Sequence, residues 1–169
     1  MAALEHLSLS RNQLTGSIPD NFRNLAKLDQ FYAGQNQLTG SIPEFLGSLT
    51  NLRNINLNFN KLTGPIPASL GNLSKMQYLT LNDNLLINAI PSSLGNLTNL
   101  QSLRLQNNQL SGPIPANFGN LSQLQHLWLY NNRLSGCFPE LLRAFCGKSV
   151  YTYSNPGLPG EGNFTAFCN

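Results

Sequence analysis

A 24-residue period runs through most of the 169-residue chain and constrains its fold more than any other feature. One asparagine and one proline recur at this interval in six successive copies. The asparagines are Asn12, Asn36, Asn60, Asn84, Asn108 and Asn132, and the prolines are Pro19, Pro43, Pro67, Pro91, Pro115 and Pro139. Because self-similarity at a period of roughly 20–50 residues is the signature of a repeat architecture, we expect a coil that advances one turn per unit.

Each unit, such as residues 100–121, contains segments with different structural preferences. The alternating pattern L-x-x-L-x-L favours a short strand with one buried face. The asparagine follows, where its amide can pair with backbone groups that would otherwise be buried without partners. A glycine then permits a sharp bend, Ile-Pro holds an extended segment, and [LF]-x-x-L fits one turn of 3₁₀ helix.

Strands that recur once per turn must pair in parallel with their counterparts in adjacent turns, about 4.8 Å away. The predicted fold is therefore an α/β solenoid with a continuous apolar interior, a concave parallel β-sheet, and short 3₁₀ or helical turns on the convex side. We expect six 24-residue repeats in residues 1–147 and a degenerate seventh turn in residues 148–169 that acts as a C-terminal cap.

The unit L-T-G-x-I-P-x-x-L-G-x-L-x-x-L, as in residues 38–52, resembles the plant-type subclass of leucine-rich repeats. That subclass occurs in plant receptor ectodomains, in polygalacturonase-inhibiting proteins and in some bacterial secreted proteins. The resemblance covers about residues 4–147 and implies a right-handed superhelix. Its motifs are highly specific for the fold and carry little information about a ligand.

The 24-residue frame can be continued into the last turn. It places Tyr151 and Tyr153 in inward-facing leucine columns and Leu158 in the next column, with the strand near residues 150–154. The aromatic residues of segment 163–167 would then cover the last open face of the core. The Asn-Pro-Gly-Leu sequence in this turn is similar to closing segments of the same repeat class.

The three cysteines, Cys137, Cys146 and Cys168, all lie near the C-terminus. Cys137 and Cys146 flank a segment that we expect to be helical. Their Cα atoms would then be about 13 Å apart, beyond the roughly 7 Å limit for a disulfide. Cys146 and Cys168 occupy nearly equivalent positions on adjacent turns, so we predict that they pair and that Cys137 is free. The alternative pairing of Cys137 with Cys146 stays open if the terminal turn is not helical.

The residues between the inward leucines should point outward on the concave side, where rigid strands form a large surface suited to recognition. Aromatic residues and arginine are the types that interface hot spots favour. The candidate partner-binding residues are therefore Trp128, Tyr130, His126, Arg104, Tyr78 and Tyr32. Trp128, the only tryptophan, is the best single candidate. The competing interpretation is that these side chains merely stack along the sheet.

Repeat four departs from the consensus with the sequence Leu-Leu-Ile-Asn-Ala at residues 85–89. Asn88 can adopt the left-handed conformation in place of glycine. Leu85 and Ile87 should then project as a small apolar spot, unless the change is only neutral variation in a surface loop.

Four Asn-x-Ser/Thr sequons are candidates for N-glycosylation in a eukaryotic secretory pathway. Their asparagines are Asn72, Asn96, Asn120 and Asn163. The first three recur at the repeat period, so the alternative is that Asn-Leu-Ser/Thr simply forms the turn from helix to strand.

The composition and motifs argue against catalysis and against nucleic-acid binding. Charged residues make up only 10% of the chain and the net charge is +3, without the clustered Lys and Arg of a nucleic-acid binder. We find no apolar run of membrane-spanning length, phosphate loop, paired CxxC or HExxH. His6 and His126 should lie about 24 Å apart along the stack and so cannot share a metal. Asp83 is the only carboxylate near the concave columns, so we expect no enzyme activity, cofactor or metal.

These observations predict a recognition module that binds a protein through the concave face. Two alternatives stay open, namely binding of a cell-wall polysaccharide and a structural role as a fragment of a longer repeat array. The disulfide and the resemblance favour an extracellular or cell-surface location, although the first thirty residues lack the pattern of a signal peptide. The first turn begins at Leu4 without a cap, which predicts self-association through that end.

Overall fold

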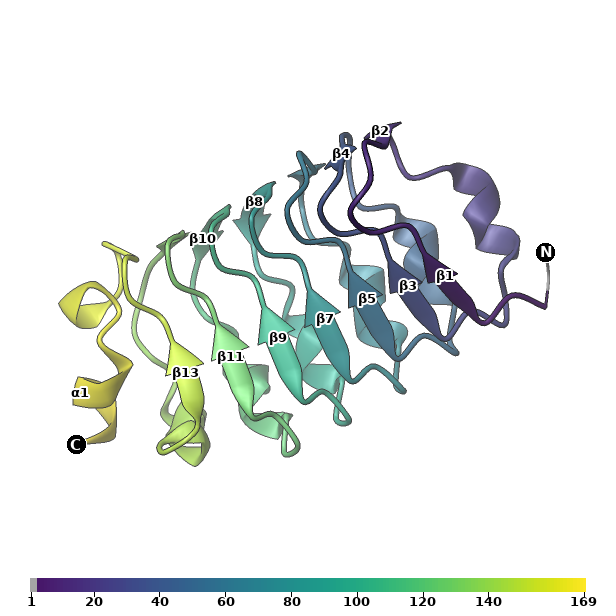
Figure 1. Ribbon diagram of the computed structural model, residues 1–169. Coiled ribbons are helices and arrows are strands. Elements are labelled where there is room, and N and C mark those ends of the chain that lie inside the picture. The colour runs from purple at the N-terminus through teal and green to yellow at the C-terminus, as the bar shows by residue number, and fades with distance from the viewer. Residues whose placement is uncertain (1–2) are drawn as a thin grey trace.

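The computed structural model describes residues 3–169 as a curved stack of coils with the two termini at opposite ends (Figure 1). One strand from each coil forms a seven-stranded parallel sheet on the concave side. Its strands, in spatial order, are β1 (His6–Ser8), β3 (Gln30–Tyr32), β5 (Asn54–Asn56), β7 (Tyr78–Thr80), β9 (Ser102–Arg104), β11 (His126–Trp128) and β13 (Ser149–Tyr151). The predicted solenoid with a concave parallel sheet is confirmed.

The opposite side of the stack carries one 3₁₀ helix per coil, each beginning directly after the repeated proline, whose backbone is extended. These helices are Asp20–Asn24, Glu44–Ser48, Ala68–Asn72, Ser92–Asn96, Ala116–Asn120 and Glu140–Phe145. Proline fixes φ and lacks a donor, which suits the residue just before a helix. The chain ends in a short 3₁₀ turn, Pro159–Glu161, and the helix α1 (Phe164–Cys168).

A second set of short parallel strands lies between the concave sheet and the 3₁₀ helices. It comprises β2 (Thr15–Gly16) with β4 (Gln37–Leu38), and β6 (Thr63–Gly64), β8 (Leu85–Ala89), β10 (Gln109–Gly112) and β12 (Arg133–Leu134) in that order. The sequence analysis did not anticipate these strands. Most are two residues long, too short for an alternating pattern to be recognised.

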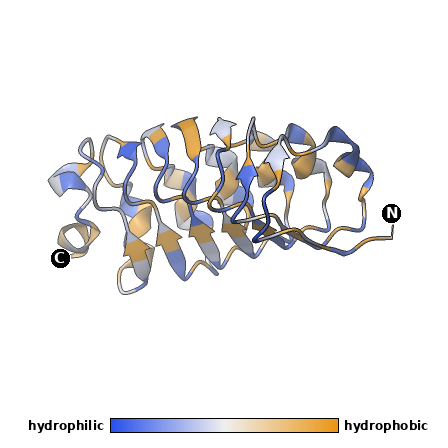
Figure 2. Cartoon of the chain, turned by 45° about the horizontal axis from the view of Figure 1, so that its top comes forward, coloured by the Kyte–Doolittle hydropathy of each residue, from blue (hydrophilic) through white to orange (hydrophobic). Residues whose placement is uncertain are grey.

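The inward residues of every coil form one continuous hydrophobic core. Leu79, Leu103 and Leu127, at equivalent positions in β7, β9 and β11, are essentially inaccessible to solvent. Figure 2 shows a row of hydrophobic residues along the neighbouring concave strands, whereas the helices and loops carry both hydrophobic and hydrophilic residues. The core thus runs along the whole stack and holds the concave strands in register.

The repeated asparagines form a ladder inside the coil, as predicted. Asn84, for example, donates from Nδ2 to the Leu81 carbonyl of its own coil and to the Leu57 carbonyl of the preceding coil, at 3.1 and 3.0 Å. Its Oδ1 accepts from the Leu62 N–H at 3.0 Å. Equivalent bonds recur at Asn36, Asn60, Asn108 and Asn132. Each of these five asparagines therefore links two successive coils, whereas Asn12 bonds only within the first coil.

Repeat four has the local structure that its sequence predicts. Asn88 adopts φ = +68°, close to the +76° of Gly64 at the equivalent position one coil earlier. Leu85 and Ile87 are 45% and 40% exposed. β8 stands out as a hydrophobic strand in Figure 2.

The seventh turn differs from the predicted frame by one residue. Val150 of β13 pairs with Leu127, and Tyr151 pairs with Trp128, a spacing of 23 residues. The chain is one residue shorter between Pro139 and β13 than between Pro115 and β11, and a one-residue shift turns every side chain of a strand to the other face. The inward placement of Tyr151 and Tyr153 was therefore wrong, and both are exposed, at 43% and 51%.

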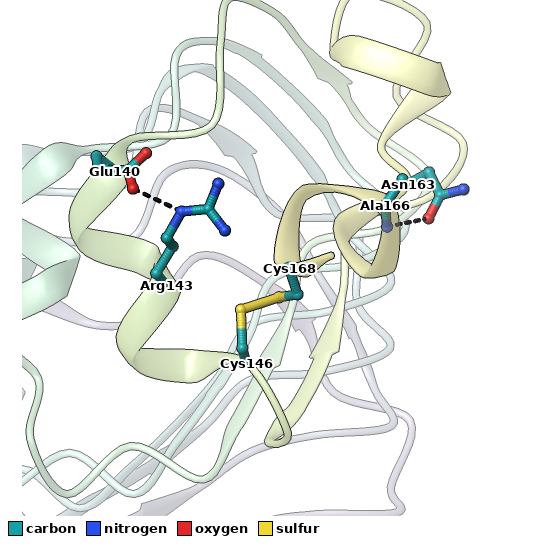
Figure 3. The surroundings of a disulfide bond; sticks show 6 residues. All are labelled: Glu140, Arg143, Cys146, Asn163, Ala166 and Cys168. Carbon is teal, nitrogen blue, oxygen red and sulfur yellow. Dashed lines mark hydrogen bonds and ion pairs between the residues drawn. A yellow bond between two sulfur atoms is a disulfide. The ribbon is translucent and has the colours of Figure 1, made fainter.

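The C-terminal end of the core is covered by α1 and held by a disulfide (Figure 3). Cys146 and Cys168 are bonded, with their Cα atoms 5.6 Å apart, and Cys137 is free and exposed. This is the pairing expected from the sequence. Phe164 is buried against Phe138, with ring centres 5.5 Å apart. The expected aromatic cover of the core is therefore present.

The first coil has no comparable cover within residues 3–169. Leu4 and Leu14 are 36% and 39% exposed. An apolar cavity of about 240 Å³ lies beside Leu14, Ile18 and Phe22. Among the described residues, no helix is both long and apolar enough to cross a membrane.

Candidate partner-binding site on the concave face

Parallel pairing aligns equivalent residues of β9, β11 and β13 across the concave sheet. Trp128 of β11 lies beside Arg104 of β9 on one side and beside Tyr151 of β13 on the other. Leu103 and Leu127 are buried, so the alternation of each strand sends the three larger side chains outward. Trp128 is partly exposed on this face, as the sequence analysis predicts.

The side chains in this row contact one another. The guanidinium carbon of Arg104 lies 4.2 Å from the centre of the Trp128 ring, well within the range of a cation–π interaction. The Tyr151 ring centre is 5.7 Å from that of Trp128, and the His126 ring approaches Trp128 edge-on at 6.4 Å. The indole ring is thus held between a cation and an aromatic ring.

A second aromatic pair lies next to this row. The rings of Tyr130 and Tyr153 stack with centres 4.7 Å apart and planes 9° from parallel. Tyr153 also approaches Tyr151 at 6.3 Å, which joins the pair to the row. We call this set the concave cluster, and it comprises Arg104, His126, Trp128, Tyr130, Tyr151 and Tyr153.

The surroundings of Tyr130 raise the pKa of its hydroxyl above the usual value for tyrosine. Loss of solvent is the main cause, and charges at Tyr153 and Asp83 add to it. The nearby Gln106 side chain and the positive charge of Arg104 act in the opposite direction. The hydroxyl is therefore protonated at neutral pH and can donate a hydrogen bond to a ligand.

Five buried side-chain nitrogen or oxygen atoms in residues 3–169 have no hydrogen-bond partner, and all five belong to the concave face. They are Asn54 Oδ1, Asn82 Oδ1, Ser102 Oγ, Gln106 Oε1 and Trp128 Nε1. Buried polar atoms in folded proteins are nearly always paired. Three of these five belong to β9, β11 or the residues that follow them directly, so hydrogen-bonding capacity is left unused at the concave cluster.

The structure brings four of the six predicted contact residues together and separates the other two from them. Arg104, His126, Trp128 and Tyr130 belong to the concave cluster. Tyr78 lies at its border, where its hydroxyl donates to Gln101 Oε1 at 2.6 Å.

Tyr32 lies three strands away from Arg104, roughly 14 Å at usual strand spacing. Its hydroxyl accepts a hydrogen bond from Asn54. This side chain therefore belongs to the opposite half of the concave face.

Sequence reasoning missed Tyr151 and Tyr153 as concave residues. Two signals could have identified them. Asn155 follows Asn132 by 23 residues and makes the same ladder contacts, including acceptance from the Leu134 N–H at 2.9 Å. Thr152, between the two tyrosines, is buried and donates to the Gly162 carbonyl.

The four sequon asparagines are all exposed. In the three that recur at the repeat period, the Ser or Thr N–H donates to the asparagine carbonyl, as from Ser74 to Asn72 at 3.0 Å. These sequons therefore form the turn from helix to strand. Asn163 instead begins α1, where its Oδ1 accepts from the Ala166 N–H at 3.0 Å (Figure 3).

Residues 3–169 contain no group of three or more His, Cys, Asp or Glu side chains placed to hold a metal ion. The carboxylate of Asp83 lies at the rim of the concave face. Its oxygens accept hydrogen bonds from the Asn82 and Asn107 side chains. The site thus presents aromatic rings, one guanidinium and uncharged polar groups.

Family models for leucine-rich repeats match three stretches of the sequence. A model described as leucine rich repeat matches residues 50–110, and one described as leucine rich repeats (2 copies) matches residues 98–142. A third, also described as leucine rich repeat, matches residues 3–25. Together these stretches make up more than half of the chain. No curated protein matches it by sequence.

Solved structures of similar fold come from plants. The ectodomain of the Arabidopsis thaliana receptor kinase GASSHO1/SCHENGEN3, in complex with CASPARIAN STRIP INTEGRITY FACTOR 2, is 41% identical over 90% of this chain and 19% of that chain, with a TM-score of 0.86. The plant peptide hormone receptor RGFR1 in complex with RGF2 is 38% identical over 85% and 23%, with a TM-score of 0.82. A plant ice-binding protein is 33% identical over 84% and 46%, with a TM-score of 0.77.

The chain spans about a fifth of the length of the two receptors. The leucine-rich-repeat models together match residues 3–25 and 50–142, and the receptor ectodomain of similar fold is 41% identical over 90% of the chain. The protein therefore belongs to the leucine-rich-repeat family and is of the plant type.

Proposed function

We propose that this chain is a non-catalytic, extracellular recognition module that binds a protein or peptide through the concave cluster. The observation that carries the proposal is the location of the unpaired polar atoms. Every buried side-chain polar atom without a partner in residues 3–169 belongs to the concave face, and the cluster adjoins three of them. These atoms have less than 1 Å² of exposed surface, so a ligand pairs with them only where neighbouring side chains move aside, and each such pairing would recover about 1–3 kcal/mol.

The cluster also has the composition of an interface hot spot. Tryptophan, tyrosine and arginine dominate binding energy at protein interfaces, and they act best where neighbouring groups exclude water. Trp128 is partly buried between Arg104 and Tyr151. These residues lie on rigid strands with a common register, so little conformational entropy is lost when a partner binds.

The similarity to plant receptors supports a protein ligand. The two receptors described above were solved in complex with CASPARIAN STRIP INTEGRITY FACTOR 2 and with RGF2. The first of them is the ectodomain of a membrane receptor kinase. An extracellular location agrees with the disulfide in this chain, because disulfides persist in oxidising compartments.

The orientation of the aromatic rings favours a protein over a polysaccharide. Sugars stack on free aromatic faces, whereas Trp128 lies between Arg104 and Tyr151. Tyr130 and Tyr153 likewise cover one face of each other. The lateral stacking considered as the competing interpretation of the sequence is thus present, and it reduces the aromatic surface on which a sugar could stack.

A substitution at Trp128 tests this proposal. Partners would be captured from extracellular extracts and, in parallel, on a glycan array with the wild-type chain. We expect a protein or peptide partner whose affinity falls about tenfold or more with Trp128→Ala. Tyr32→Ala, four strands away from Trp128 on the same face, should change the affinity less than about twofold. Binding to glycans alone, or a partner indifferent to Trp128→Ala, would contradict the proposal.

Ice binding is a second candidate that one observation favours. Thr15 of β2, Thr63 of β6 and Thr39, which directly follows β4, recur at the 24-residue period in successive coils, and all three are exposed. The strand register pairs Thr15 with Gln37 and Thr63 with Ser41, so successive threonines are offset along the strands. Regularly spaced hydroxyl and methyl groups are suited to ordered water, and one structural neighbour is a plant ice-binding protein. If this function is correct, the wild-type chain inhibits ice recrystallisation and Thr39→Lys abolishes the effect. Absence of inhibition by the wild-type chain rejects it.

A further inference from the structure

Arg104 carries a positive charge that no carboxylate neutralises within residues 3–169. The described residues contain three ion pairs, Arg23–Asp20, Arg53–Asp29 and Arg143–Glu140. Arg104 takes part in none of them and rests on the Trp128 ring instead. Guanidinium groups are weakly hydrated and stack well on aromatic rings, which leaves their N–H donors free for a planar anion.

The nearest concave carboxylate is already engaged by other groups. Asp83 accepts a hydrogen bond from the Asn107 side chain at 2.8 Å and a second from Asn82. Asn107 in turn accepts from Asn131 at 2.9 Å, so the chain of amides leads along the rim of the face. This arrangement holds the Asp83 charge at the rim, apart from Arg104.

The unpaired atoms near Arg104 fall into two groups of opposite character. Ser102 Oγ and Trp128 Nε1 can donate hydrogen bonds, as the guanidinium does. Gln106 Oε1 and Asn82 Oδ1 can only accept. Ser102, Gln106 and Asn82 are 3%, 4% and 5% exposed, so these polar side chains lie deep in the face.

A partly exposed guanidinium without a carboxylate partner matches a particular ligand. A carboxylate needs several donors, and the N–H groups of Arg104 are fixed in place by its contact with Trp128. We propose that the site selects an extended peptide segment with an internal aspartate or glutamate, whose carboxylate pairs with Arg104. This inference rests on the proposed function and specifies the partner's chemistry.

The test uses short random peptides displayed with their C-termini fused to a carrier, so that side chains supply the only carboxylates. Peptides are selected on the whole wild-type chain and then synthesised with amidated C-termini. We expect one enriched Asp or Glu position. Its replacement by Asn or Gln should weaken binding to the wild-type chain about tenfold, as expected for a charge-assisted hydrogen bond.

Three variants test whether Arg104 is the residue that binds the carboxylate. With Arg104→Gln the acidic and amide forms of a peptide should bind equally, and Arg104→Lys should restore part of the preference. Arg133→Gln removes the same charge from β12, outside the concave face, and should keep the full preference. Thermal unfolding of each variant shows whether the fold is intact.

The outcomes separate this inference from the proposed function. Selected peptides that depend on Trp128 but show no acidic position, or whose acidic preference survives Arg104→Gln, overturn the inference and leave the proposed function standing. Failure to select any peptide whose binding is weakened by Trp128→Ala overturns both.

Discussion

At the scale of single residues, the asparagine ladder and the concave cluster respond to the same physical demand in different ways. Asn84 is 5% exposed and every one of its polar atoms is paired. Asn82, two residues earlier and equally buried, has an unpaired Oδ1. The first asparagine faces the core and stabilises the coil, whereas the second faces the concave side. Burial alone therefore does not show which role a polar side chain has. A buried side chain whose polar atoms are all paired stabilises the fold, whereas one with an unpaired atom is a candidate for ligand binding.

Removing a ladder asparagine should destabilise the chain strongly. Asn84→Ala leaves the buried Leu62 N–H without a partner, whereas the Leu57 and Leu81 carbonyls still accept from Asn60 and Asn108. We therefore expect a loss of about 2 kcal/mol in the free energy of unfolding. Asn12→Ala is the matched control, because Asn12 is exposed and bonds only within its own coil. Its effect should stay below about 1 kcal/mol in urea unfolding. Equal effects of the two substitutions would show that the ladder does not stabilise the stack.

At the scale of elements, the 24-residue period predicted the features that recur in every coil. The prediction failed at the seventh turn, where the repeat is one residue shorter. Strand order, register and the buried leucines follow from the 24-residue spacing. The seventh strand does not, because one residue fewer before β13 turned Tyr151 and Tyr153 outward. Four cluster residues were therefore predicted and two were missed. The unpaired polar atoms were also beyond prediction, since they depend on how neighbouring side chains cover them.

The disulfide should be the main stabiliser of the terminal turn. Cys146 and Cys168 are 22 residues apart, and closing a loop of this size is worth about 3 kcal/mol in the chain-entropy model. The double substitution Cys146→Ser with Cys168→Ser should lower the free energy of unfolding by about this amount. Cys137→Ser, at the free and exposed cysteine, should have no measurable effect on urea unfolding. A stability unchanged by the double substitution would contradict this role.

At the scale of the whole molecule, the two ends of the stack are unlike. The C-terminal end is closed by α1, Phe164 and the disulfide. The other end presents the free edge of β1 and an apolar cavity beside Leu14. An exposed strand edge next to apolar side chains is a template for pairing with another chain. The concave cluster lies near the closed, C-terminal end of the curved stack.

We propose that the 169-residue chain associates through its open end. Light scattering should show an apparent mass that rises with concentration, and Leu14→Lys should reduce the rise because it places a charge in the apolar contact. Leu141→Lys is the control, since Leu141 is 59% exposed on the convex side, far from this end. A mass that stays monomeric at high concentration would rule out this association.

Fluorescence of the single tryptophan tests the central claim, recognition by the concave cluster, most directly. Trp128 is the only tryptophan in the chain, so its emission reports on the cluster without any label. The purified chain would be titrated with the peptide selected against it. We predict a saturable change in Trp128 emission with the same midpoint as an independent binding measurement, and an unchanged emission at saturating peptide would contradict the account.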